Sequence, residues 1–187
     1  FLDKEENYNK LIKGENMLDV FLIGFLLKDS LLVASYKIAT IIPFAMNFLP
    51  MTIIVYMYPY LVQAANDKQM IKEKLQNLIK YMVIINALIS IFCIIFADII
   101  IRIIFGSKFI DSVPAFRILM LSYFVIGSFR SPLGNTLSAL KKVKLNLIIV
   151  IVTGFLNIGL DYFLIIRYGM NGAAFTSLTV ASVSALM

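Results

Sequence analysis

Long apolar runs separated by short polar breaks constrain this chain more than any other feature. A bilayer-spanning helix needs about 20 mostly apolar residues, and the sequence offers six runs of this character. The residues are 60% hydrophobic and only 15% charged, whereas an average soluble domain is about 25% charged. The sequence therefore predicts an all-α polytopic membrane protein with about six transmembrane helices. The runs centre on 17–27 and cover about 31–63, 77–105, 113–140, 145–167 and 172–187.

The two ends of the chain indicate a piece of a longer protein. Residues 1–16 are polar, and residues 17–187 form the predicted helical bundle. The chain opens at Phe1 without an initiator Met and stops at Met187 inside an apolar run. We therefore expect a polar segment at one edge of a fragment and a truncated helix at the other.

Residues that begin helices lie in the breaks. The long polar connection 64–77 carries mixed charges at helical spacing, which predicts a short interfacial helix. Asp111 or Ser112 is predicted to cap the fourth helix, because Pro114 follows in its first turn. The breaks thus indicate helix ends within one bundle.

Glycine and proline mark further turns and weak points. Gly169 and Gly172 are expected to supply backbone conformations that other residues resist. Proline inside a helix removes a backbone hydrogen-bond donor and weakens the helix. The second run contains three prolines, Pro43, Pro50 and Pro59.

Lysine and arginine are unevenly divided between the two sides of the predicted bundle. Because cytoplasmic loops carry an excess of these residues, the connections 64–77 and 141–144 are predicted to be cytoplasmic. The net charge of +6 is then a topology signal and implies no nucleic acid partner. One side holds Lys4, Lys10, Lys13, Lys68, Lys72, Lys74, Lys80, Lys141, Lys142 and Lys144, and the other holds Lys28, Arg102, Lys108 and Arg167.

The composition removes several kinds of chemistry. The sequence has no His, which excludes Ser-His and Cys-His dyads, imidazole metal sites and His proton relays. The lone Cys93 lies inside an apolar run and has no disulfide partner in the chain. We expect no catalytic residue, no metal and no cofactor, and we expect Cys93 to pack as a small hydrophobic side chain.

Charged residues inside the predicted spans are candidate functional positions, because a charge near the bilayer centre costs about 2.5–3.5 kcal/mol on insertion scales. Asp19 and Arg130 each allow two interpretations: a group that faces a cavity, or a buried partner of a charge on a neighbouring helix. Asp98 and Arg102 are four residues apart and are predicted to form a structural ion pair.

The fourth predicted helix has two polar faces. A helical projection places Arg130 beside Gly127 and Gly134 and away from the other polar stripe. Pro132 favours a kink that changes which face is wet, so both faces stay open as the cavity lining. The other stripe consists of Arg117, Ser128, Ser131 and Asn135.

The fifth predicted helix has one polar stripe within roughly 80° of arc. Such a stripe faces protein or water, so Asn157 and Asp161 are expected inside the bundle, with Ile149 and Ile151 more exposed. Substrate lining and hydrogen bonding between helices are both open interpretations. The stripe consists of Asn146, Thr153, Gly154, Asn157 and Asp161.

Four segments carry an ordered pattern. The string DVFLIGFLLKDSLLVASY (19–36) begins with an Asp, and Pro59 lies in MYPYLVQ near the end of the next apolar run. An apolar run, an FG turn and PAFRIL follow within 96–124, and a Leu-Asn-rich helix, a Tyr-Gly turn and a Gly-Ala-Ala entry lie within 135–178. In this order, the segments resemble the second half of polysaccharide or O-antigen flippases of the multidrug/oligosaccharidyl-lipid/polysaccharide superfamily.

The resemblance implies one half of a two-bundle transporter, with the missing N-terminal bundle of the same chain as its partner. It further implies alternating-access export of polysaccharide precursors, in which undecaprenyl-diphosphate-linked oligosaccharides are flipped across the bacterial inner membrane. The lipid-linked substrate and membrane lipid would be the other partners. No bond is broken in such a process, so we expect a transporter and not an enzyme.

Within this interpretation, the cavity residues have separable roles. Arg130 and Arg117 would bind the diphosphate through their forked donors. Asn135, Asn157 and Asp161 would hydrogen-bond sugar hydroxyls.

Two alternatives stay open. An ion-coupled drug or cation antiporter of the same superfamily would use Asp19 or Asp161 for coupling and would tolerate few cavity cations such as Arg130. A membrane-embedded glycan-modifying enzyme would need a catalytic constellation.

Residues 1–16 depart from the family pattern, because they are polar where the family continues an apolar helix.

Overall fold

The computed structural model describes residues 19–187, and every regular element in that range is a helix. The expectations for residues 1–16, including Lys4, Lys10 and Lys13, lie outside the described residues. The prediction of an all-α chain is confirmed. The elements are a helix over 19–27, α2 (Ser30–Met46), α3 (Phe48–Ala64), α4 (Lys68–Ile95), α5 (Ala97–Phe105), the 3₁₀ turn η1 (Ser107–Ser112), α6 (Val113–Val125), the π-turn η2 (Ile126–Arg130), α7 (Ser131–Ala139), α8 (Val143–Tyr168) and α9 (Met170–Leu186).

Four helical stretches of the described chain are long and apolar enough to cross a membrane. Ser30–Ala64, Lys68–Ile95, Ser107–Ala139 and Val143–Tyr168 meet this test. They correspond to the second to fifth predicted spans. The sixth predicted span is α9, an apolar helix of 17 residues, and the helix over 19–27 is the described part of the first.

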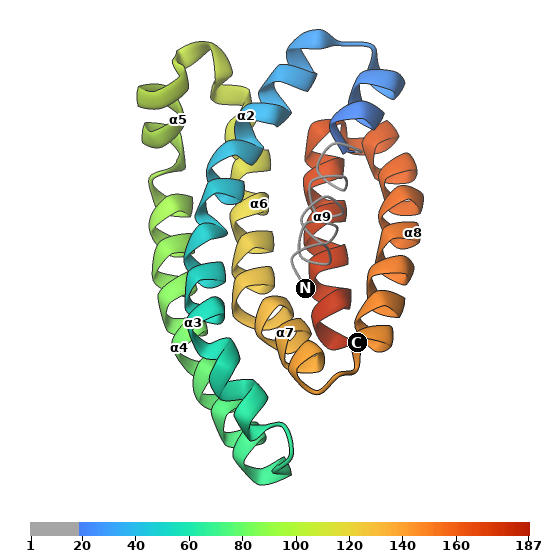
Figure 1. Ribbon diagram of the computed structural model, residues 1–187. Helices are drawn as coiled ribbons and strands as arrows, with labels where there is room; N and C mark the ends of the chain where they lie inside the picture. The colour runs from blue at the N-terminus through green and yellow to red at the C-terminus, as the bar shows by residue number, and fades with distance from the viewer. Residues whose placement is uncertain (1–18) are drawn as a thin grey trace.

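The long helices run side by side, with their connections at two opposite ends (Figure 1). The turns at 65–67 and 140–142 lie at one end, whereas the turns at 28–29 and 106–112 and the turn at Gly169 lie at the other. This is the alternation that the count of lysine and arginine predicted. Large side chains such as Phe155 and Phe163 of α8 are exposed, as expected for a surface that faces lipid.

The expectation of a separate interfacial helix at 64–77 is wrong. Asp67 begins α4, because its carboxylate accepts hydrogen bonds from the backbone N–H groups of Gln69 and Met70. The polar residues that follow Asp67 form the first turns of the continuous helix α4. No proline or glycine interrupts α4 between Lys68 and Ile95, so nothing separates its polar start from its apolar span.

The third predicted run is divided in the structure. α4 ends at Ile95, Phe96 leaves helical geometry, and α5 begins at Ala97. After η1, α6 starts at Val113 with Ser112 at the N-cap position and Pro114 in its first turn, as predicted. The Ser112 hydroxyl donates to the carbonyl of Phe109. Ser112 therefore occupies the predicted N-cap position, but its side chain does not cap α6.

The α8–α9 hairpin turns at Gly169 and packs tightly at Gly172. Gly169 has φ of 60°, which is the conformation that glycine was predicted to supply. Gly172 is different, because it lies inside α9. A Cβ at Gly172 would collide with the backbone carbonyl of Leu164, so this glycine serves close helix packing and not a turn.

Two apolar clusters hold the bundle together. The larger one joins α2, α4, α5, α6, α8 and α9 and includes Tyr36, Phe116 and Met120, all buried. Cys93 belongs to it, as expected of a small hydrophobic side chain. The smaller cluster joins α3, α4 and α7 through Ile54, Leu61, Leu78, Met82 and Ala139.

Candidate functional site

Asp19 is the first described residue of the chain and lies buried between three other helices. Only 2% of it is exposed. Its Oδ2 accepts a hydrogen bond of 2.8 Å from the Tyr36 hydroxyl of α2 and one of 3.0 Å from the Ser177 hydroxyl of α9. Two helices are therefore tied to one carboxylate oxygen.

Helix α8 brings a second acid to the same place. Asn157 and Asp161 are one helical turn apart, and both are buried. The Asp161 carboxyl lies against that of Asp19, with Thr176 of α9 beside it. The Asn157 amide also reaches Asp19. We call Asp19, Asn157, Asp161 and Thr176 the acidic cluster.

The acidic cluster leaves oxygen atoms without partners. Within residues 19–187, the buried Oδ1 of Asp19, Oδ1 of Asn157 and both carboxylate oxygens of Asp161 accept no hydrogen bond. Most buried acceptors in native proteins have a partner, and an unpaired buried carboxylate is costly. Convergent carboxylate and amide oxygens are the ligands of hard cations. The arrangement is suited to a cation or a proton that neutralises the two acids.

The ligand set is unlike that of a transition-metal site. The part of the chain that the structure describes has no group of three His, Cys, Asp or Glu residues placed to hold a metal ion. Oxygen atoms from two acids, an amide and a hydroxyl favour an alkali or alkaline-earth cation instead.

Of the residues predicted from the sequence, Asp19, Asn157 and Asp161 come together, and Arg130, Arg117 and Asn135 do not join them. The amide of Asn135 donates to the Ser131 carbonyl one turn earlier in its own helix. Arg130 of η2 is buried against a different part of α8, where its Nη2 donates a hydrogen bond of 2.7 Å to Oδ1 of Asn146.

The predicted ion pair between Asp98 and Arg102 is wrong. Asp98 pairs with Arg117 of α6, and the Arg117 Nε also donates to the Ile94 carbonyl. The break at Phe96 turns α5 so that Asp98 meets α6 across the bundle. Both side chains are about half exposed, so the pair contributes little stability, but it occupies the Arg117 guanidinium in this conformation.

The polar stripe of α8 faces the bundle, as predicted. Thr153, Asn157 and Asp161 are all buried, and Ile151 on another face is 49% exposed. The expectation for Ile149 is wrong, because this side chain is only 7% exposed. It lies four residues before Thr153 and accepts the Thr153 hydroxyl on its carbonyl, so it shares the inner face.

The sequence interpretation missed Tyr36, Thr176 and Ser177. Hydroxyl-bearing residues are common in apolar helices, so nothing in the local sequence distinguished these three from other helix residues. The available signal was the spacing of Asn157 and Asp161, which placed two acceptors on one face and implied donors opposite them.

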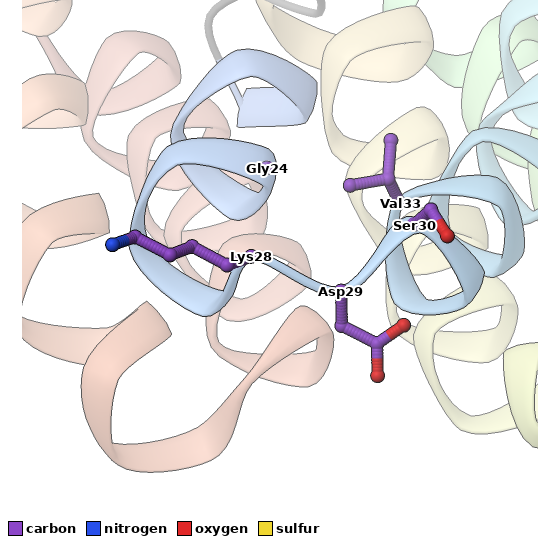
Figure 2. Close-up of a pocket in the computed structure, with 5 residues that line it drawn as sticks. All are labelled: Gly24, Lys28, Asp29, Ser30 and Val33. Atoms are coloured by element: carbon purple, nitrogen blue, oxygen red, sulfur yellow. The ribbon is translucent and has the colours of Figure 1, made fainter.

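One hollow on the described surface lies away from the acidic cluster. A pocket of about 410 Å³ lies at the turn between the helix over 19–27 and α2, lined by Gly24, Lys28, Asp29, Ser30 and Val33. In Figure 2 the side chains of Lys28 and Asp29 point away from each other. Asp29 caps α2 by accepting from Leu31 and Leu32, so the pocket has no convergent polar groups.

The fold of the described residues matches that of a solved transporter. An outward-facing multidrug resistance MATE family transporter of the MOP superfamily superposes with a TM-score of 0.79 at 18% identity. The match covers 95% of this chain and 40% of the transporter chain. This chain therefore spans less than half the length of that protein.

Sequence comparison identifies the family. No curated protein sequence matches the chain at a significant level. A family model described as "Polysaccharide biosynthesis protein" matches residues 9–114, which is more than half of the chain. The matched range contains Asp19 and Tyr36 but ends before α8. With this match and the transporter fold together, the chain belongs to the polysaccharide biosynthesis protein family.

Proposed function

We propose that this chain is one helical bundle of a cation- or proton-coupled transporter that exports polysaccharide precursors. The substrate is an undecaprenyl-diphosphate-linked oligosaccharide, which is flipped across the bacterial inner membrane by alternating access. Family membership supports the polysaccharide pathway, and the fold supports transport. The acidic cluster, with its unpartnered oxygens, is the observation that carries the coupling.

Coupling requires that the ion bind one conformation more tightly than the other. Tyr36 of α2 and Ser177 of α9 both donate to Oδ2 of Asp19, the carboxyl group that lies beside Asp161. An ion or proton at the acids competes with or reinforces these hydrogen bonds. Its arrival and departure therefore change how the helix over 19–27, α2 and α9 pack.

The substrate headgroup meets a different region. Asn146 and Asp161 are 15 residues apart on α8, a rise of about 22 Å, so Arg130 lies far from the acids. We assign the diphosphate to Arg130, because its forked guanidinium suits phosphate oxygens. In this proposal Asn157 and Asp161 bind the coupling ion and not the sugar hydroxyls. Of the three residues first assigned to the sugar, Asn135 alone keeps that role. The turns at 65–67 and 140–142 are cytoplasmic in this proposal.

The test uses the full-length protein in cells that display the glycan. Asp19→Asn and Asp161→Asn each remove one charge at nearly constant size. We expect glycan display to fall sharply while the membrane level of the protein stays normal. Asp111→Asn is the matched control, since Asp111 is an exposed acid in η1. Normal display by both cluster variants would overturn the proposed coupling.

A second measurement separates flipping from drug export. Purified full-length protein in vesicles should move a fluorescent polyprenyl-diphosphate-linked sugar in response to a sodium or proton gradient. Transport of cationic drugs, without transport of the lipid-linked sugar, would favour the alternative function of an ion-coupled drug antiporter.

A further inference from the structure

Arg130 is the last residue of the π-turn η2. The backbone N–H of Ser131 donates to the carbonyl of Ile126, five residues earlier. A π-turn inserts one extra residue into an α-helix and occurs often at functional sites. It also changes which residues share a face, because residues five apart become neighbours.

Asn86 of α4 bridges two such residues. Its Oδ1 accepts 2.8 Å from the Tyr123 hydroxyl, and its Nδ2 donates 3.3 Å to Oγ of Ser128. Tyr123 and Ser128 are five apart, so a regular α-helix would point them about 140° away from each other. The π-turn begins at Ile126 and rotates Ser128 toward the side of Tyr123, where the Asn86 amide contacts both hydroxyls. This explains why Ser128 leaves the stripe of Arg117 and Asn135 that a regular projection predicted.

Close packing at Gly127 reinforces this geometry. A Cβ at Gly127 would lie 2.9 Å from Nδ2 of Asn86 and 3.3 Å from Cγ of Pro50. α3 and α4 therefore approach the π-turn backbone at a position where only glycine fits without a shift of the neighbours.

Arg130, at the end of the π-turn, is held by contacts with α7 and α8. Its Nη2 donates to Asn146, and a Cβ at Gly134 would collide with its Nη1. Gly134 thus leaves the space in which the guanidinium lies. No carboxylate among residues 19–187 forms an ion pair with Arg130. If the π-turn relaxed into regular helix, the chain on its two sides would rotate relative to each other by about 100°, and Arg130 would leave this space.

We propose that Asn86 is a positioning residue for Arg130. By bridging Tyr123 and Ser128, Asn86 holds the π-turn, and the π-turn directs the guanidinium into the Gly134 space beside Asn146, where its remaining donors meet a diphosphate. This inference rests on the proposed function, in which Arg130 binds the diphosphate of the lipid-linked substrate.

The experiment measures the affinity of purified full-length protein for geranylgeranyl diphosphate, a short polyprenyl diphosphate. The variants are Arg130→Gln, Tyr123→Phe, Asn86→Leu and the double variant Tyr123→Phe/Arg130→Gln. Tyr123→Phe keeps the ring and removes only the hydroxyl, so it serves if Asn86→Leu does not fold. Ser90→Ala is the matched control, because Ser90 lies one turn further along α4 and donates to the Met120 carbonyl of α6, before the π-turn.

We expect Arg130→Gln to weaken binding by about tenfold or more, since it removes charge-assisted donors. Tyr123→Phe should weaken binding severalfold in the parent protein and have no further effect in the Arg130→Gln background. A structural role for Tyr123 that is independent of Arg130 would lower affinity equally in both backgrounds, which would overturn the inference. Unchanged binding by Tyr123→Phe alone would overturn it as well. Unchanged binding by Arg130→Gln would instead refute the proposed diphosphate contact itself.

Discussion

Two polar clusters are buried in this bundle, and they differ in how completely their atoms are paired. In the first, the amide of Asn86 accepts from Tyr123 and donates to Ser128, and none of the three side chains has an unpartnered buried oxygen or nitrogen. In the acidic cluster, four oxygens of the described residues have no partner. A satisfied network fixes one arrangement of helices, whereas an unsatisfied one is complete only when something binds.

The two tyrosines illustrate the difference. Tyr123 and Tyr36 are both buried and both donate to an oxygen on a neighbouring helix. The acceptor of Tyr123 is a neutral amide, whose hydrogen bonding stays the same under all conditions. The acceptor of Tyr36 is a carboxylate, which changes when a proton or cation arrives. The hydrogen bond of Tyr123 to the Asn86 amide is therefore independent of pH. In the proposed function, the hydrogen bond of Tyr36 to Asp19 is the one that an ion alters.

The largest effect should come from removing the paired amide. Asn86→Leu leaves the Tyr123 and Ser128 hydroxyls buried without partners, at about 1–3 kcal/mol for each unpaired group. We expect the free energy of unfolding to fall by about 3 kcal/mol in total, measured by denaturant unfolding in detergent. A variant as stable as the parent would show that the network does not hold the bundle.

A coupling ion should stabilise the parent protein. A ligand that binds only the folded state at a hundred times its Kd adds about 2.7 kcal/mol. We expect thermal unfolding to shift upward with sodium or with added protons, and the shift should survive Ser90→Ala but disappear in Asp161→Leu. If neither ion shifts the parent protein, the acidic cluster is not an ion site.

Replacing Asp161 should not lower the free energy of unfolding, in contrast to replacing Asn86. Asp161→Leu replaces a buried carboxyl whose oxygens have no hydrogen-bond partner by an apolar group of similar size, which removes the cost of burying that carboxyl. We expect no loss of unfolding free energy without added ion, together with loss of transport. A strong loss of stability would mean that Asp161 is a structural partner.

The smallest effect should come from one donor to the acid. Ser177→Ala removes the 3.0 Å hydrogen bond to Asp19, which is worth about 1 kcal/mol. We expect a severalfold change in ion affinity, read from the ion dependence of thermal unfolding. Ser182→Ala is the matched control, because its hydroxyl donates to the Leu178 carbonyl within its own helix. An equal change in both variants would remove Ser177 from the site.

Local patterning predicted most of the helices and part of the candidate site. Apolar runs identified the spans, and helical spacing placed Asn157 and Asp161 on the inner face of α8, where the structure has them. A regular helical projection placed Ser128 on one stripe with Arg117 and Asn135, but a π-turn at Ile126–Arg130 adds a residue to the period. The change in composition at 64–77 predicted a separate interfacial helix, but the polar residues from Lys68 onward form the first turns of α4.

The sequence by itself determined that this chain is a helical membrane bundle, because hydrophobic length and period depend only on neighbours along the chain. Tertiary structure decided which polar groups meet. Asp98 pairs with Arg117 and not with Arg102, and Asp19 reaches Ser177 across 158 residues. In our proposal the π-turn is held by Asn86, a side chain from another helix that contacts Tyr123 and Ser128. Partner choice depends on how helices pack, and packing brings together residues that no local period relates.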